Sequence, residues 1–173
     1  LAYNVAFMGG DLAEAERLLR DSRWETALGL GVVVAEPKAL RWAEVTSLQN
    51  RPAEAARHAA EAVAYFEGRN WTERQQSFAR MGIARAWSCA GRHEEAIRIA
   101  RDVLASQEQR DQFTLSMMRF WMGRILIAAD RPEEVLAVWR ANAAVPGSFP
   151  AVSIWLLDPY WARLRGDPRY AEI

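Results

Sequence analysis

A short turn motif recurs along this chain at a nearly fixed interval, and this repeat constrains the fold more than any other feature. The intervals between successive turns are 40, 41 and 39 residues. On both sides of each turn, apolar residues recur every three to four positions, as in a helix that buries one face. A lone helical hairpin cannot bury that face, so the sequence predicts an all-α solenoid of about four stacked hairpins. The turns are centred on Gly10, Asn50, Gly91 and Asp130.

The length of 173 residues suits one domain. We expect helical repeats over residues 1–143 and a C-terminal capping segment of the same domain over residues 144–173. A helix is expected from Leu12 to about Leu28, and Gly29–Glu36 is expected to form the next turn and first helical residues. A lone strand there would have no partner. The approximate repeats are 1–30, 31–70, 71–110 and 111–143.

Composition excludes several classes of function. The formal net charge is zero, and no basic patch suggests nucleic-acid binding. The longest apolar run, Gly29–Ala35, is far too short to insert across a membrane. The chain opens at Leu1 in the middle of a helical pattern, so we expect it to come from a longer protein. A cytoplasmic location is expected, with the periplasm as the alternative if a preceding part carries a membrane span.

No set of residues predicts catalysis, a metal or a cofactor. Cys89 and His93 are four residues apart, but zinc needs three or four ligands. Glu94 and Glu95 lie in a predicted first helical turn, where acidic residues stabilise the helix dipole. A hydrolase or lyase would need a nucleophile and a base in one site, and the sequence shows no such pair. We therefore expect a protein that is not an enzyme.

The repeats resemble those of the tetratricopeptide family. In that register Ile83, Ala84 and Trp87 take packing positions of one helix, and Ala96 and Ala100 those of the next. The period departs from the family because it is nearer 40 residues than the usual ~34. The tail resembles the end of helical-repeat modules in bacterial serine/threonine kinases, adenylate cyclases and TolB-like or winged-helix regulators. The matching residues are Asp158, Pro159, Trp161, Leu164, Arg165, Asp167, Pro168, Arg169 and Tyr170.

This resemblance implies a right-handed superhelix and a non-catalytic interaction module of a bacterial regulatory or signalling protein. The implied partner is a protein or peptide segment, an attached effector domain or a second copy of the chain. The alternative is a small-molecule, sugar-like sensor domain of a transcriptional regulator. An open groove would indicate a peptide partner, whereas a closed pocket lined by tryptophan and polar groups would indicate a sensor.

The resemblance also places a candidate binding groove on the first helix of each hairpin. In that register these positions are expected to be exposed, with an apolar floor and two guanidinium groups that could bind carboxylates. The expected ligand is a segment with apolar anchors and an acidic residue. The competing interpretation is that the arginines are solvated and paired with nearby acidic residues. The candidate groove residues are Leu40, Glu44, Phe78, Met81, Arg85, Met117, Phe120 and Arg124.

Overall fold

The computed structural model describes residues 2–28, 33–107, 112–145 and 157–168. These residues are mostly helical, and none of their helices is long and apolar enough to cross a membrane. The elements are α1 (Ala2–Met8), α2 (Leu12–Asp21), β1 (Thr26–Leu28), β2 (Ala35–Pro37), α3 (Lys38–Leu48), α4 (Pro52–Glu67), α5 (Glu73–Cys89), α6 (His93–Gln107), α7 (Gln112–Ala128), α8 (Pro132–Ala143) and the 3₁₀ helix η1 (Trp161–Leu164).

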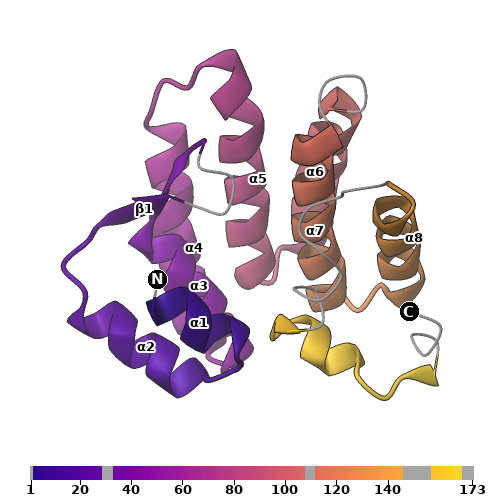
Figure 1. Cartoon of the computed structure of the whole chain (residues 1–173). Helices are drawn as coiled ribbons and strands as arrows, with labels where there is room; N and C mark the ends of the chain where they lie inside the picture. Colours follow the sequence, from indigo (N-terminus) through magenta and orange to yellow (C-terminus); the bar gives the residue numbers. More distant parts are fainter. Residues whose placement is uncertain (1, 29–32, 108–111, 146–156, 169–173) are drawn as a thin grey trace.

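The helices pack in the order of the sequence, in adjacent pairs (Figure 1). The pairs are α1 with α2, α3 with α4, α5 with α6, and α7 with α8. The second helix of each pair also packs against the first helix of the next pair. The first helices α3, α5 and α7 contact one another in turn, so they form an inner row. The prediction of a helical fold built from consecutive hairpins is confirmed at this level.

The four predicted turns share one backbone geometry. Their central residues have positive φ values, of 78° at Gly10, 58° at Asn50, 78° at Gly91 and 54° at Asp130. Glycine adopts this conformation without strain, and asparagine and aspartate tolerate it better than other residues. In each turn the central N–H donates to the carbonyl three residues back, and the next N–H donates to the carbonyl five residues back, which satisfies the carbonyls at the helix end.

Three of the turns are followed by the same ion pair. The arginine after the turn residue contacts a glutamate in the first turn of the following helix. Proline follows that arginine directly at the start of α4 and α8, where its missing N–H costs nothing. The side chains therefore repeat along with the backbone. The pairs are Arg51–Glu54, Arg92–Glu95 and Arg131–Glu134.

The prediction for the segment between the first two hairpins was wrong. It expected a helix that continues to about Leu28, followed by a turn and the first residues of the next helix up to Glu36. Helix α2 ends at Asp21, and the chain then forms two short antiparallel strands in which Thr26 pairs with Pro37 and Leu28 with Ala35. A lone strand in this segment would have no partner. Instead, a second segment seven residues after β1 supplies its partner. Residues 29–32 between the strands lie outside the described part of the chain.

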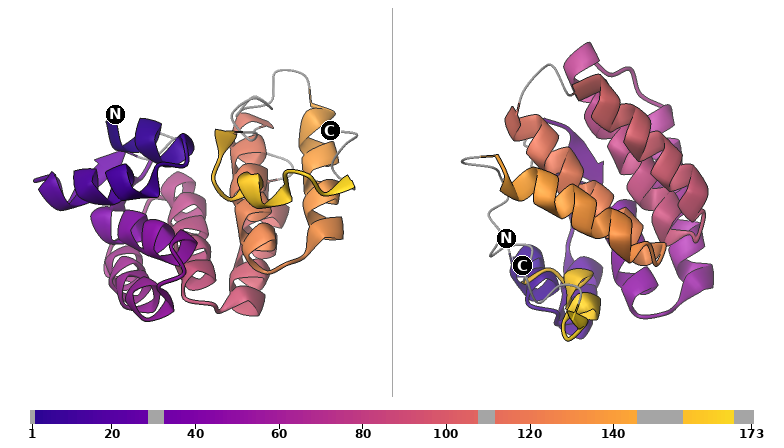
Figure 2. Two further views of the ribbon diagram at one scale, coloured as in Figure 1. Left: turned by 90° about the horizontal axis from the view of Figure 1, so that it is seen from below. Right: turned by 90° about the vertical axis from the view of Figure 1, so that its right-hand side faces the viewer.

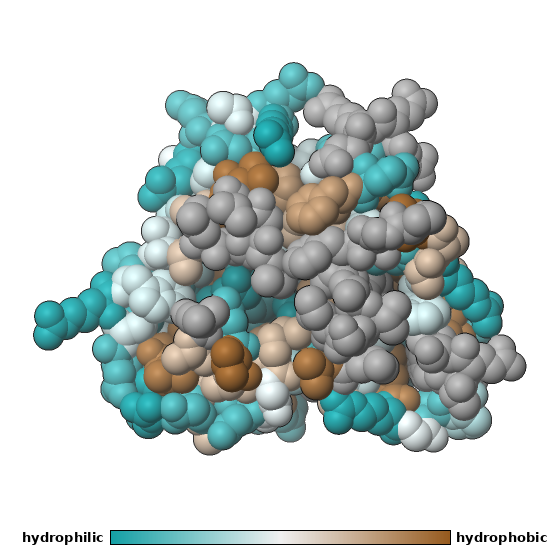
Figure 3. Space-filling model, viewed as in Figure 1, coloured by the Kyte–Doolittle hydropathy of each residue, from teal (hydrophilic) through white to brown (hydrophobic). Residues whose placement is uncertain are grey.

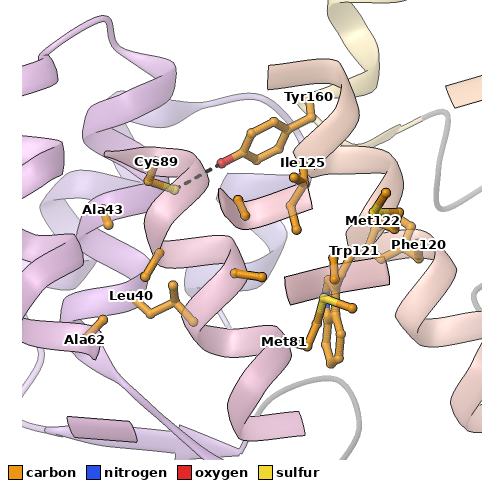
Figure 4. Close-up of a cluster of buried hydrophobic side chains, with 14 of the residues drawn as sticks. Leu40, Ala43, Ala62, Met81, Cys89, Phe120, Trp121, Met122, Ile125 and Tyr160 are labelled. Carbon is orange, nitrogen blue, oxygen red and sulfur yellow. Dashed lines mark hydrogen bonds between the residues drawn. The ribbon is translucent and has the colours of Figure 1, made fainter. Parts of the chain in front are cut away.

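The core follows the inner row of helices. Leu40, Met81 and Phe120 occupy the same position in successive repeats, and all three are completely buried (Figure 4). Phe78 meets Trp121 edge to face, with ring centroids 6.1 Å apart. An apolar stack of this kind binds each hairpin to the next, because every layer fills the space left by its neighbour.

The first helix and the described C-terminal segment approach each other across this row. Two views place the start of that segment beside α1 (Figures 1 and 2), and Leu157 lines one cavity together with Val5 and Phe7 of α1. The guanidinium carbon of Arg124 on α7 lies 5.6 Å from the ring centre of Phe7 on α1. The 3₁₀ helix η1 packs against α7. The division into repeats and cap stays a prediction, and Tyr170 lies outside the described residues.

Gly82 allows α4 and α5 to pack closely, and its replacement tests this contact. A Cβ at Gly82 would lie 2.6 Å from Cε2 of Phe66, whose ring is buried. We expect Gly82→Ala to lower the free energy of unfolding by about 1–2 kcal/mol, because overpacking outweighs the gain in helix propensity. Urea unfolding measures this. In a Phe66→Leu background the same change should cost nothing, and an equal cost in both backgrounds would contradict the contact.

Candidate functional site

The eight candidate groove residues are all buried. The expectation that they are exposed is therefore wrong. The first helices pack tightly side by side, and α1 and the segment from Leu157 approach the same face. The aliphatic and aromatic members belong to the core described above. The charged members, Glu44, Arg85 and Arg124, are only 1%, 3% and 4% exposed. Their role in binding a partner stays a prediction.

These three charged residues occupy the same position in successive repeats and contact one another. Arg85 donates from Nε and Nη2 to one oxygen of Glu44, at 3.1 Å and 2.6 Å. Arg124 Nη1 lies 3.5 Å from the same oxygen. The two arginines expected to bind a partner's carboxylate therefore bind a carboxylate of their own chain. The competing interpretation was right that they are paired, although it placed them in solvent.

Two further members of this cluster were not recognised from the sequence. Glu36, on β2, accepts from Arg85 Nη1 at 2.6 Å and lies 2.5 Å from Arg41 Nη2. Arg41, on α3, also donates to Glu44 at 3.1 Å. Arg41 precedes Glu44 by three residues, which is the spacing of a helical ion pair. That spacing was the available signal. Glu36 gave none, because its segment was expected to be a turn.

The cluster is completed from the C-terminal segment. Asp158 accepts from Arg124 Nε at 2.8 Å and is also bonded by Arg124 Nη2. The ion-pair cluster thus holds three arginines and three acidic residues, and it joins β2, α3, α5, α7 and the segment beyond residue 156. Its members are Glu36, Arg41, Glu44, Arg85, Arg124 and Asp158.

Burial and pairing act in opposite directions on these charges. Burial raises the pKa of Glu44, but the neighbouring arginines, Arg85 foremost, lower it more, so the net pKa is about 2. Burial likewise raises the pKa of Asp158, and there it outweighs the attraction of Arg124. Glu44 is therefore held firmly in its charged form, whereas Asp158 is the carboxylate of the cluster whose pKa is raised overall, because burial outweighs pairing there.

The segment after Asp158 also brings an aromatic residue into the core. The Tyr160 hydroxyl lies 3.8 Å from Sγ of Cys89, and both side chains are buried (Figure 4). Burial raises the pKa of the Cys89 thiol to about 12. A thiol in this state is neither a nucleophile nor a ready metal ligand. Cys89 is therefore a protonated, buried thiol that packs against Tyr160.

A cavity opens beside the cluster, between α1 and the start of the C-terminal segment. It has a volume of about 430 Å³ and is lined mainly by apolar side chains, with Arg41 and Arg124 at its inner side. Val5 and Leu157 at its wall are 68% and 59% exposed. On the face shown in Figure 3, hydrophobic surface gathers where α1 lies. The lining residues are Asn4, Val5, Phe7, Met8, Gly9, Arg41, Arg124 and Leu157.

Arg124 points one N–H group of its Nη2 towards this cavity, and the acceptor of that N–H group is weak. Its Nη2 lies 3.7 Å from the thioether sulfur of Met8, which is one of the lining residues. A thioether is a poor acceptor compared with a carboxylate or carbonyl oxygen. Three guanidinium groups also carry more N–H donors than three carboxylates have lone pairs. The cavity therefore offers an apolar wall and a donor that can bind an oxygen atom.

Within the described ranges, no group of three or more His, Cys, Asp or Glu side chains could hold a metal ion. Cys89 and His93 both lie beside a small surface hollow at the α5–α6 turn, and no third ligand joins them there. Comparisons with known protein families, with curated proteins and with solved structures find no match for this chain.

Proposed function

We propose that this chain is a non-catalytic interaction module that binds a segment of a protein partner. The observation that carries the proposal is the 430 Å³ cavity beside the buried ion-pair cluster. Specific binding sites typically combine apolar walls with a few polar groups that orient the ligand. Here Val5, Phe7 and Leu157 supply the walls, and Arg124 supplies the oriented donor.

The arrangement of helices supports a right-handed superhelix like that of tetratricopeptide arrays. Successive hairpins repeat their turn geometry, and their first helices pack in one row. The motif from Asp158 to Tyr170 supports a place in a bacterial regulatory protein next to an effector domain. A module of this kind acts by holding partners rather than by changing them.

A protein segment fits this cavity better than a sugar does. A sugar sensor is expected to line its pocket with tryptophan as well as polar groups, and no tryptophan appears among the lining residues that the structure describes. The exposed Val5 and Leu157 instead form an apolar rim, which is typical of surfaces that bind other proteins. An apolar anchor of the partner would enter the cavity, and a neighbouring carboxylate or carbonyl oxygen would accept from Arg124.

A peptide selection on the intact chain tests this proposal. Peptides are selected from a random phage-displayed library, and the affinity of the best one is measured by fluorescence anisotropy. We expect selected peptides to combine an apolar residue with an acidic one. Val5→Glu, at the exposed rim, should weaken binding at least about 10-fold, or about 1.4 kcal/mol. Ala137→Glu, on an exposed position of α8, is the matched control and should change nothing.

Two outcomes would contradict the proposal. Selected peptides that bind Val5→Glu as tightly as the parent would place the site elsewhere. Failure to select any peptide, together with saturable binding of a small apolar carboxylate such as octanoate, would favour a small-molecule sensor. Calorimetry measures octanoate binding to the parent, Val5→Glu and Ala137→Glu. If the cavity is a small-molecule site, Val5→Glu should weaken octanoate binding and Ala137→Glu should not.

A further inference from the structure

The end of the described chain occupies the face on which the sequence predicts a partner. The segment Leu157–Trp161, here called the tail segment, lies against α7 and beside α1 (Figures 1 and 2). It carries an apolar residue, Leu157, followed by an acidic one, Asp158, and then two aromatic ones. This is the chemistry expected of the external ligand. The tail segment therefore binds where a partner segment is expected to bind.

The acidic contact of the tail segment is not the strongest one that Arg124 can make. Arg124 Nε and Nη2 both donate to the same oxygen of Asp158, Oδ2. The other oxygen, Oδ1, accepts from the backbone N–H of Tyr160 at 2.9 Å and so caps the tail segment's own turn. A guanidinium group binds a carboxylate best through two parallel hydrogen bonds, one to each oxygen. Asp158 has only one oxygen free for that purpose.

Two aromatic anchors hold the tail segment in place. Tyr160 and Trp161 are 5% and 7% exposed. The guanidinium carbon of Arg124 lies 5.4 Å from the ring centre of Tyr160, and the Tyr160 hydroxyl reaches Cys89 (Figure 4). Arg124 thus contacts both the acidic and the aromatic part of the tail segment. A competing segment would need an equivalent pair to replace it.

We propose that the tail segment is an internal competitor, and that the partner is a protein segment with an acidic residue followed closely by an aromatic one. Binding of this partner displaces Asp158 from Arg124 and frees the tail segment. This inference rests on the proposed function, since it names the ligand of the same face. The raised pKa of Asp158, which follows from its burial, supports it, because the bound carboxylate is poorly stabilised in place.

A peptide with the sequence of residues 157–166, LDPYWARLRG, is the probe for this inference. It is labelled and titrated with the intact chain, and binding is followed by fluorescence anisotropy. The parent should bind it weakly, because Asp158 of the tail segment already occupies Arg124. Asp158→Asn should bind it at least about 10-fold more tightly, since an internal competitor that occupies nine-tenths of the molecules reduces the apparent affinity by that factor.

Controls separate competition from loss of folding. Asp158→Ser keeps one side-chain oxygen that can cap the turn at Tyr160 and removes the carboxylate oxygen that Arg124 binds. It should show the same gain, and thermal melts followed by circular dichroism should show both variants folded. Asp102→Asn, on the exposed face of α6, should bind like the parent. A peptide with asparagine in place of its aspartate should bind every chain weakly.

Equal affinity of the peptide for the parent, Asp158→Asn and Asp158→Ser would overturn the inference. The result is independent of the cavity test. If Val5→Glu abolishes binding of library peptides while the tail peptide shows no gain, the proposed function stands and internal competition is wrong. If library peptides ignore Val5→Glu while the tail peptide shows the gain, the cavity is not the site, and Arg124 alone defines it.

Discussion

Replacing Arg85 with alanine is expected to lower the free energy of unfolding by about 3–5 kcal/mol. Arg85 is almost completely buried and donates hydrogen bonds to both Glu36 and Glu44. Its removal leaves two buried carboxylates with fewer donors, and an uncompensated buried charge is among the most costly defects in a fold. Urea denaturation at pH 7, followed by circular dichroism, measures the loss.

Two further variants make this result specific to the buried pairing. Arg85→Lys keeps the charge but replaces the planar fork with a single ammonium group, so it should fall between the parent and Arg85→Ala. Arg80→Ala, on the same helix, removes an exposed arginine whose Nη2 lies 3.4 Å from Asp102, and it should cost no more than about 1 kcal/mol. Similar losses for Arg80→Ala and Arg85→Ala would show that the cluster contributes no more than a surface pair.

The helical part of this fold could be predicted because its signals are local. The turns at Asn50 and Gly91 are set by which residues tolerate positive φ, and the start of α5 by the capping box of Thr72 and Gln75. Each of these interactions spans only a few residues. The register of the repeat follows from such signals, and it predicts that Glu44, Arg85 and Arg124 are neighbours; in the structure both arginines contact Glu44.

The exposure of those residues could not be predicted, because it depends on elements distant in sequence. Asp158 reaches Arg124 across 34 residues, and Glu36 reaches Arg85 across 49. No repeat pattern records these contacts, since neither Asp158 nor Glu36 belongs to a repeated position. An arginine at a groove position therefore looks the same in the sequence whether it meets solvent or a buried carboxylate. The strands were missed for a similar reason, because β1 and β2 stabilise each other only as a pair.

Acidification should change the contributions of Asp158 and Glu44, the two carboxylates that Arg124 contacts, to the stability of the fold in opposite directions. Asp158 has a raised pKa, so its charged form is disfavoured in the folded state, and protonation on acidification relieves that cost. Relative to Asp158→Asn, the parent should therefore gain stability as the pH falls from 7. Relative to Glu44→Gln, the parent should instead lose stability as the pH falls, because the arginines around Glu44 lower its pKa. If acidification changed the stability of the parent in the same direction relative to Asp158→Asn and to Glu44→Gln, the electrostatic roles assigned to these two residues would be wrong.

Glu44 is expected to give the larger of the two pH effects. The arginines, chiefly Arg85, lower its pKa from 4.5 to about 2 against the effect of burial. The stabilisation is complete above about pH 4.5 and is lost as the pH falls toward 2. At about 1.4 kcal/mol for each pH unit, the advantage of the parent over Glu44→Gln should shrink by about 2 kcal/mol between pH 7 and pH 3. Urea unfolding at both pH values measures it, with Glu67→Gln, at an exposed position of α4, as the control that shows no comparable change. An advantage that is the same at pH 3 as at pH 7 would mean that Glu44 is not held in its charged form by the cluster.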